Sequence, residues 1–102
     1  MMTNRTTKIH TFRALVEAAE LANLIKRNVD CEANRIHCIT TLKFGVRWVR
    51  VDVGHCGKYM IDEDGTIYGI KSYGVPHRGH RYGTLDAPHL PGMNDADQTE
   101  GR

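Results

Sequence analysis

The hydrophobic pattern of this chain changes once, from a helical period to an alternating one, and that change limits the folds open to it. Over residues 11–28, polar side chains share one stripe and apolar side chains the other, which predicts an amphipathic helix. From Arg35 onward the pattern alternates and becomes rich in β-branched and aromatic residues, which predicts strands. One helix followed by strands in a chain of 102 residues predicts a single α+β domain with one modest core.

The apolar face of the predicted helix should pack across a sheet, because alanines on that face permit a close approach. The helix is expected to end near Asn28. The residues expected on its buried face are Phe12, Leu15, Val16, Ala19, Ala22 and Ile25.

The clearest local prediction is a hairpin made of residues 58–62 and 66–71. Its turn falls at Asp64-Gly65, where glycine tolerates the positive φ of a tight turn. A weaker first strand is predicted over residues 35–42. The expected architecture is therefore one N-terminal helix packed on a three- to four-stranded antiparallel sheet, in two layers.

A second strand is predicted over residues 46–53, where alternate side chains point to opposite faces. Arg47 and Val49 should share one face and Trp48 and Arg50 the other. Residues 74–86 read GVPHRGHRYGTLD and predict a stiffened loop, because Pro76 favours extended chain before it and the glycines allow sharp turns.

Composition divides the chain into three parts: a flexible N-terminus over residues 1–10, one domain over residues 11–86, and a disordered acidic tail over residues 87–102. Up to residue 82 the chain has 13 Lys and Arg against 8 Asp and Glu, a net +5. From residue 83 it has 1 against 4, a net −3. A basic body of this size is compatible with nucleic acid but does not by itself indicate it.

The cysteine count and the hydropathy favour a cytoplasmic protein. Three cysteines cannot all pair within one chain, and no charged start followed by an apolar stretch indicates secretion. No segment approaches the roughly 20 apolar residues of a membrane span. We therefore expect reduced thiols and no membrane partner.

The order of motifs in residues 57–86, GKYMIDEDGTIYGIKSYGVPHRGHRYGTLD, resembles that of small uncharacterised proteins encoded by bacteriophages of actinobacteria. The shared pattern is a Gly-Lys-Tyr-Met hairpin, a Tyr-Gly step, a basic His-x-Gly-His-x-Tyr-Gly segment and Thr-Leu-Asp. This resemblance implies a phage origin and the cytoplasm of a host cell, and it implies no catalytic residue.

Basic and aromatic residues are interleaved from the second predicted strand onward. Cations neutralise phosphates and aromatic rings stack on unpaired bases, so this composition suits single-stranded nucleic acid. In the alternative, Trp48 belongs to the core and the tyrosines pair across strands. The candidate binding residues, for nucleic acid or another partner, are Arg47, Arg50, Lys58, Lys71, Tyr73, His77, Arg78, His80, Arg81 and Tyr82.

Two short motifs contain residues that bind metals or act as nucleophiles, namely His55-Cys56 and His77-x-x-His80. Neighbouring side chains in extended chain point apart, so His55 and Cys56 cannot easily share one ion. Cys56 also lacks a third group to orient a base. We therefore predict no metal, no cofactor and no enzymatic activity.

The leading hypothesis is a small non-enzymatic phage-type binding protein that acts on a host or phage macromolecule, as a modulator of a host process. It rests on Arg78, His80 and Arg81, whose accumulation loop closure alone does not explain. Single-stranded nucleic-acid binding is the first alternative. The second is self-association as a homodimer, through a sheet face that one helix leaves uncovered.

Overall fold

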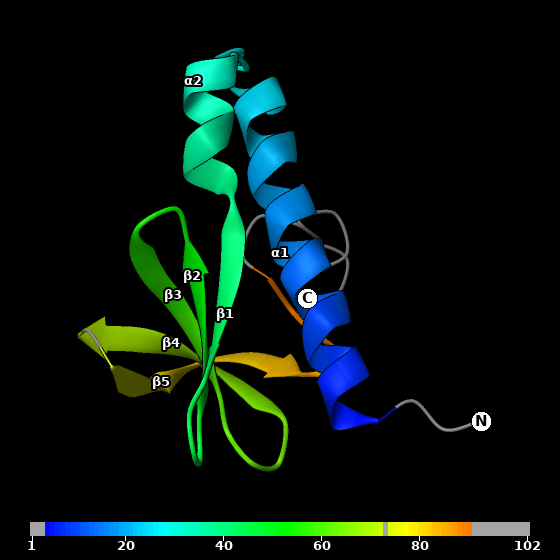
Figure 1. Ribbon diagram of the computed structural model, residues 1–102, viewed down its shortest axis with the longest axis vertical. Coiled ribbons are helices and arrows are strands. Elements are labelled where there is room, and N and C mark those ends of the chain that lie inside the picture. The colour runs from blue at the N-terminus through cyan, green and yellow to red at the C-terminus, as the bar shows by residue number, and fades with distance from the viewer. Residues whose placement is uncertain (1–3, 73, 91–102) are drawn as a thin grey trace, which may run out of the picture.

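The computed structural model describes residues 4–72 and 74–90 and shows an α+β fold (Figure 1). A long helix and a short helical segment precede a five-stranded antiparallel sheet, in which each strand pairs with its neighbour in the sequence. The helical elements are α1 (Arg5–Lys26), α2 (Glu32–Arg35) and the 3₁₀ turn η1 (Ile36–Cys38). The strands are β1 (Thr40–Phe44), β2 (Val49–Val53), β3 (Cys56–Ile61), β4 (Thr66–Ser72) and β5 (Val75–Thr84).

Helix α1 begins six residues earlier than the periodicity predicts. Asn4 caps it: the backbone of Asn4 is extended, and its side-chain oxygen accepts a hydrogen bond of 2.8 Å from the Thr7 N–H. Ile9, in the first turns, is completely buried. The expectation of a flexible segment over residues 1–10 is therefore wrong from Asn4 onward, and only its first three residues lie outside the described part of the chain.

The end of α1 is a hydrogen-bonded C-cap, as Asn28 predicts. Asn28 has φ of 60°, the left-handed conformation that asparagine tolerates better than most residues. The Asn28 N–H donates to the Ile25 carbonyl, and the Val29 N–H donates to the Leu24 carbonyl, both at 3.0 Å. These two bonds make a Schellman motif, which stops the helix and turns the chain toward α2.

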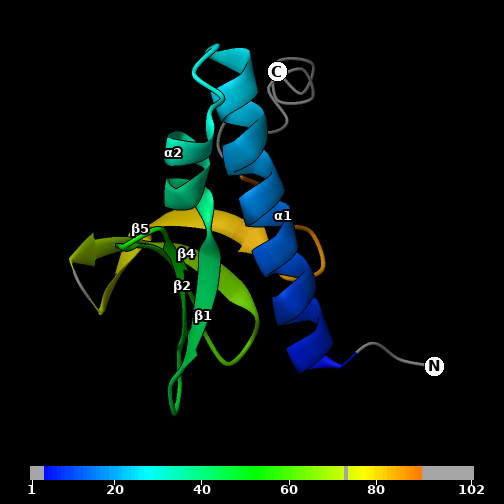
Figure 2. The same ribbon diagram turned by 45° about the horizontal axis from the view of Figure 1, so that its top comes forward.

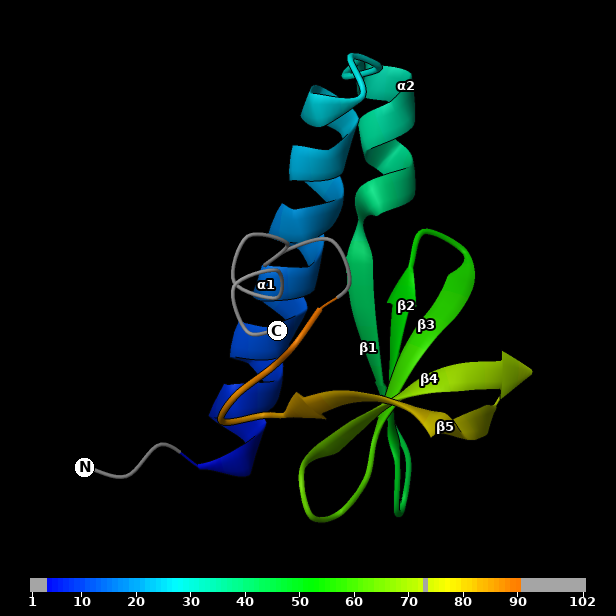
Figure 3. The ribbon, with the colours of Figure 1, turned by 180° about the vertical axis from the view of Figure 1, so that it is seen from behind.

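Only the N-terminal part of α1 covers the sheet. Ile9, Phe12 and Val16 are buried, whereas Ala22 and Ile25, predicted on the same buried face, are exposed. The ribbon shows the reason: the C-terminal end of α1 extends past the strands and lies beside α2 (Figures 1 and 3).

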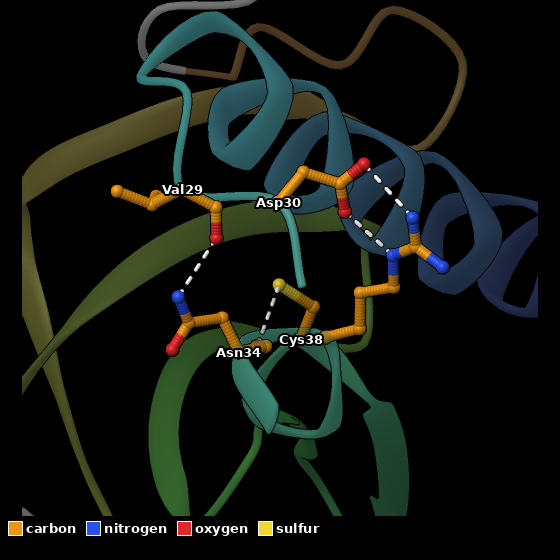
Figure 4. Close-up of polar contacts among 5 residues, drawn as sticks. Val29, Asp30, Asn34 and Cys38 are labelled. Carbon is orange, nitrogen blue, oxygen red and sulfur yellow. Dashed lines mark hydrogen bonds and ion pairs between the residues drawn. The ribbon is translucent and has the colours of Figure 1, made fainter. Parts of the chain in front are cut away.

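The first predicted strand, residues 35–42, is correct only at its C-terminal end. The chain forms α2 and η1 before β1 begins at Thr40. Local polar contacts favour this helical turn: the Asn34 amide donates to the Val29 carbonyl at 2.7 Å, and the Cys38 thiol lies 3.9 Å from the Asn34 carbonyl (Figure 4). Such side-chain bonds outweigh the weak strand preference of the segment.

The hairpin between β3 and β4 confirms the most definite sequence prediction. Gly65 has φ of 87° in the turn. The Asp62 carboxylate accepts hydrogen bonds of 2.9 Å from the N–H groups of Asp64 and Thr66, which stabilises the turn from within.

The predicted loop over residues 74–86 is instead mostly strand β5, so the sheet has five strands rather than three or four. Glycine and proline suggested a loop, but here they accompany a strand whose pairing with β4 shifts register three times. Bulges of this kind accept glycine and proline, which a regular central strand would reject.

The chain continues to pack on the domain beyond Asp86, where the acidic tail was expected to begin. Gly83 has φ of 83° and reverses the chain, and the His89 N–H then donates to the Tyr82 carbonyl at 2.8 Å. Leu90 follows and is only 1% exposed. The remainder of the expected tail, residues 91–102, lies outside the described residues.

The core lies between α1 and one face of the sheet. It contains Ile9, Phe12, Val16, Val49, Val51, Tyr59, Ile61, Ile67 and Leu90. Figure 2 shows α1 running beside β1. There, Arg13 donates to the Thr40 carbonyl at 3.1 Å and the Glu17 carboxylate accepts from the Thr40 N–H at 2.9 Å, so helix side chains occupy the edge of the sheet. No helix among the described residues is long and apolar enough to cross a membrane.

Candidate interaction site on the helix-free face

The alternation along β2 separates the two faces of the sheet as predicted. Val49 and Val51 are buried in the core under α1. Trp48, which immediately precedes β2, and Arg50 therefore project from the opposite face, which we call the helix-free face. The cross-strand partner of Arg50 on β1 is Lys43, so this exposed lysine also projects from the helix-free face.

Two arginines of β5 lie over two aromatic rings on the helix-free face. The guanidinium carbon of Arg78 is 5.4 Å from the Trp48 ring centroid and 5.8 Å from that of Tyr68, and that of Arg81 is 5.9 Å from Tyr68. The Trp48 and Tyr68 rings meet edge to face at 5.7 Å. These four residues form the arginine–aromatic cluster, in which each cation lies over at least one aromatic ring.

An irregularity of β5 brings both arginines to the same face. In a regular strand, residues three apart point to opposite faces. Here Gly69 pairs with His77 while Tyr68 pairs with Arg81. The pairing therefore advances by four residues along β5 while it advances by one residue along β4. The extra residues form a bulge that returns Arg78 to the side of the sheet that holds Arg81. The cluster therefore depends on the bulge in β5, which the regular alternation of side chains along a strand could not predict.

Arg50 and Asp52 form an ion pair on the same face, beside the cluster. Arg50 Nε and Asp52 Oδ1 are 2.9 Å apart, and both side chains are largely buried. Gly57 permits this packing, since a Cβ there would come within 2.8 Å of the Ile70 side chain. Asp52 neutralises Arg50, so the exposed positive charge of this face comes from Arg78, Arg81 and Lys43.

Several of the candidate binding residues lie outside the cluster. Lys58 forms an ion pair with Glu20 of α1, and the Tyr82 ring packs edge to face against Tyr59 at 5.2 Å, on the core side. Two further candidates also lie away from the cluster: Arg47 Nε is 3.9 Å from Glu63 Oε2, and Lys71 is exposed near the end of β4. Tyr73 lies outside the described residues.

His77 and His80 are stacked face to face in β5. Their ring centroids are 3.9 Å apart and the planes are inclined by 13°. The nitrogen lone pairs of these stacked rings lie in nearly parallel planes, so they do not converge on one ion. His77 Nδ1 is buried and has no hydrogen-bond partner among residues 4–72 and 74–90. Within the same residues, no three His, Cys, Asp or Glu side chains are grouped so as to hold a metal.

A shallow open hollow of about 240 Å³ borders the cluster. It is lined by Arg47, Trp48, Asp62, Glu63, Asp64 and Arg78. Three acidic residues of the β3–β4 turn therefore line the same space as two arginines. A ligand that enters this space meets both signs of charge within a short distance.

Two titratable groups near the core are held in their neutral forms. Burial, with a smaller contribution from Glu20 and other nearby acids, raises the pKa of the Cys38 thiol. Burial also raises the pKa of Tyr59, assisted by Tyr82 and Glu20. A protonated thiol is a poor nucleophile, so Cys38 acts as a small apolar core residue.

No protein-family model, curated protein or solved structure matches this chain. What the chain does therefore has to be inferred from the chemistry of its surface.

Proposed function

We propose that this chain is a small non-enzymatic binding protein of phage type, which contacts a host protein through its arginine–aromatic cluster. The observation that carries the proposal is the position of Arg78 over both Trp48 and Tyr68, with Arg81 also over Tyr68. The phage origin rests on the motif resemblance of residues 57–86, and it places the partner in the cytoplasm of an actinobacterial host.

Stacking on an aromatic ring makes an arginine well suited to a binding surface. A guanidinium supported by a ring loses less side-chain entropy when it binds than a freely rotating one. It keeps N–H donors in a planar fork that fits a carboxylate. Tryptophan, tyrosine and arginine are also the residues that most often dominate the binding energy of protein interfaces.

The surroundings of the cluster favour a protein partner over a nucleic acid. Asp62, Glu63 and Asp64 line the adjoining hollow and would repel a phosphate backbone. Tyr68 is only 6% exposed, so it offers no open platform for a base. A protein surface that carries both acidic and basic side chains can complement this mixed charge.

Single-stranded nucleic acid is the second candidate partner, and one observation favours it. The exposed cations Lys43, Arg78 and Arg81 project from one face, and Trp48 at the border of that face is only half-buried. Phosphates could contact the cations while a base stacks on a guanidinium or on the indole.

A tagged pull-down from actinobacterial host lysate, with and without nuclease, tests the proposal. The wild-type protein should retain one stoichiometric protein after nuclease treatment. The Arg78→Ala/Arg81→Ala double variant should retain at least about tenfold less, as expected when interface anchors are removed. The control Arg5→Ala/Lys8→Ala removes the same charge from the first turn of α1 and should retain the wild-type amount.

The outcomes separate the two candidates. A partner lost on nuclease treatment would reject the protein candidate. Fluorescence anisotropy with short labelled oligonucleotides then tests the second candidate, which predicts binding that weakens steeply with salt and disappears in the Arg78→Ala/Arg81→Ala variant. Equal retention by the cluster variant and the α1 control would reject the cluster as the contact surface.

A further inference from the structure

The C-terminal end of α1, α2 and η1 together project from the domain beyond the strands (Figures 1 and 3). We call residues 22–39 the helical projection. A helix of 22 residues is about 33 Å long, and its buried side chains are Ile9, Phe12 and Val16, all in the N-terminal part. The C-terminal part of α1 therefore contributes no buried side chain to the core.

Four aliphatic side chains of the projection are substantially exposed. The exposed fractions are 64% for Ile25, 56% for Ile36, 51% for Ile39 and 38% for Val29. Ile36 begins the 3₁₀ turn η1 and Ile39 follows it. Side chains three residues apart in a 3₁₀ turn eclipse each other, so these two lie together. Several large aliphatic groups at one end of a small domain indicate a surface that is covered in use.

The backbone beneath these side chains is firmly held. Arg35 donates to both carboxylate oxygens of Asp30, and the Asn34 amide donates to the Val29 carbonyl (Figure 4). Together with the C-cap of α1, these bonds fix the connection between α1 and α2. The backbone that carries Ile25 and Ile36 is thus held in a defined arrangement, and an interface that forms on it does not have to order this backbone.

The charges of the projection are self-complementary. Arg27 at the end of α1 and Glu32 at the start of α2 are both exposed, and neither forms an ion pair with another described residue. A two-fold axis that passes between Arg27 and Glu32 brings the positive group of one copy toward the negative group of the other, twice over. A second copy of this chain therefore satisfies both the apolar and the charged groups.

The β1 edge of the sheet is a poorer place for two copies to meet. The side chains of Arg13 and Glu17 already occupy the backbone groups of Thr40 on β1. The next outward groups of that edge belong to Leu42 and Phe44, and pairing them across a two-fold axis would set Lys43 against its own copy. Lysine at this position protects an edge strand from pairing.

We propose that the helical projection is a homodimer interface, in which a second copy covers Ile25, Ile36 and Ile39 and exchanges Arg27–Glu32 ion pairs. The helix-free face stays open in this dimer, so the proposal does not depend on the proposed function. Each dimer then presents two arginine–aromatic clusters.

Sedimentation equilibrium over a range of protein concentrations tests the dimer. The wild-type chain of 11.5 kDa should reach twice that mass. Ile25→Glu/Ile36→Glu should weaken association at least about tenfold, since an unpaired charge is forced into an apolar interface. The matched control Val46→Glu alters a fully exposed residue in the β1–β2 turn and should dimerise like the wild type. Circular dichroism checks that each variant is folded.

A charge exchange tests the self-complementarity directly. Arg27→Glu and Glu32→Arg should each weaken the dimer, and the combination of both should restore it. A wild-type chain that stays monomeric at every concentration would overturn the proposal. So would a dimer that survives Ile25→Glu/Ile36→Glu, or one in which the combined charge exchange is no stronger than either single variant.

Discussion

Arg78 lies over Trp48 on the helix-free face, although the two residues belong to opposite halves of the sheet. The contact, 5.4 Å from guanidinium carbon to ring centroid, joins the start of β2 to the bulge of β5. It also shields one face of an indole that would otherwise be open to solvent. The position of Arg78 therefore depends on the fold, because the same register shift that bends β5 also places Arg78 over Trp48.

Gly83 should be important for the reversal of the chain at the end of β5, and Gly74, which precedes β5, provides the matched control. Both have positive φ, 83° and 77°, so alanine is strained at either position. A Cβ at Gly83 would also overlap the Ala87 carbonyl oxygen, whereas no atom of the described residues lies within 4 Å of one at Gly74. We expect Gly83→Ala to lower the free energy of unfolding by about 1–3 kcal/mol more than Gly74→Ala, measured by urea unfolding. Equal losses of unfolding free energy in the two variants would contradict this expectation, because the contact with the Ala87 carbonyl would then have no energetic effect.

Glu17 should matter for stability because it satisfies a buried backbone group. Its carboxylate accepts from the N–H of Thr40, a residue only 3% exposed. Glu17→Ala leaves that N–H without its partner and should cost about 1–3 kcal/mol. Glu63→Ala, which removes only an exposed ion pair with Arg47, should change the unfolding free energy by less than about 0.5 kcal/mol. Similar effects of the two substitutions would contradict the assigned role of Glu17.

Leu90 tests whether the chain beyond Asp86 belongs to the folded domain. Its side chain is in the main core cluster, so Leu90→Ala should cost about 2–5 kcal/mol by leaving a cavity. The exposed control Val46→Ala should leave the melting temperature near that of the wild type. If Leu90→Ala also leaves the melting temperature unchanged, the segment after Asp86 does not support the fold.

The three cysteines should differ in reactivity. Cys31 and Cys56 are exposed, whereas Cys38 is buried and burial raises the pKa of its thiol. At pH 8 a thiol reagent should therefore label two cysteines in the native protein and three in urea. Rapid native labelling of Cys38 would contradict its burial.

The same raised pKa of Cys38 sets the direction of a pH effect. The unfolded thiol ionises at a lower pH than the folded one. The contribution of Cys38 to stability is therefore fully present below the pKa of the unfolded thiol and is lost as the pH rises through the folded value. Cys38→Ala should make the loss of stability at alkaline pH less steep than in the wild type, which chemical unfolding between pH 7 and about 10 would measure.

The sequence correctly predicted two turns that depend on local chemistry, although it missed the Asn4 cap and the helical turn before β1. Asp64-Gly65 marked the turn of the β3–β4 hairpin, and Asn28 marked the end of α1, because both depend on the backbone freedom of a few residues. The parity of β2 correctly separated Val49 from Trp48. These features require no knowledge of distant partners.

Where distant pairing determined the structure, the sequence was insufficient. The segment that contains Arg78 and Arg81 looked like a loop because its glycines and proline signal turns, yet pairing with β4 makes it a strand. The parity of β2 placed Arg47 opposite Trp48 and argued against a shared cationic platform. It could not reveal that a bulge in β5 supplies other arginines to Trp48. Leu90 was similarly missed, because its burial depends on the reversal at Gly83.

A substitution that keeps the charge of Arg78 and Arg81 but removes their planar groups tests whether the guanidinium groups themselves make the contact. Arg78→Lys/Arg81→Lys retains both cations, whereas ammonium groups neither stack on Trp48 and Tyr68 nor present a planar fork to a carboxylate. The measurement is the dissociation constant, by calorimetry, for the host protein retained after nuclease treatment. We predict a loss of affinity of about tenfold or more relative to the wild type. An unchanged dissociation constant would show that charge alone suffices and would contradict the role assigned to the stacked arginines.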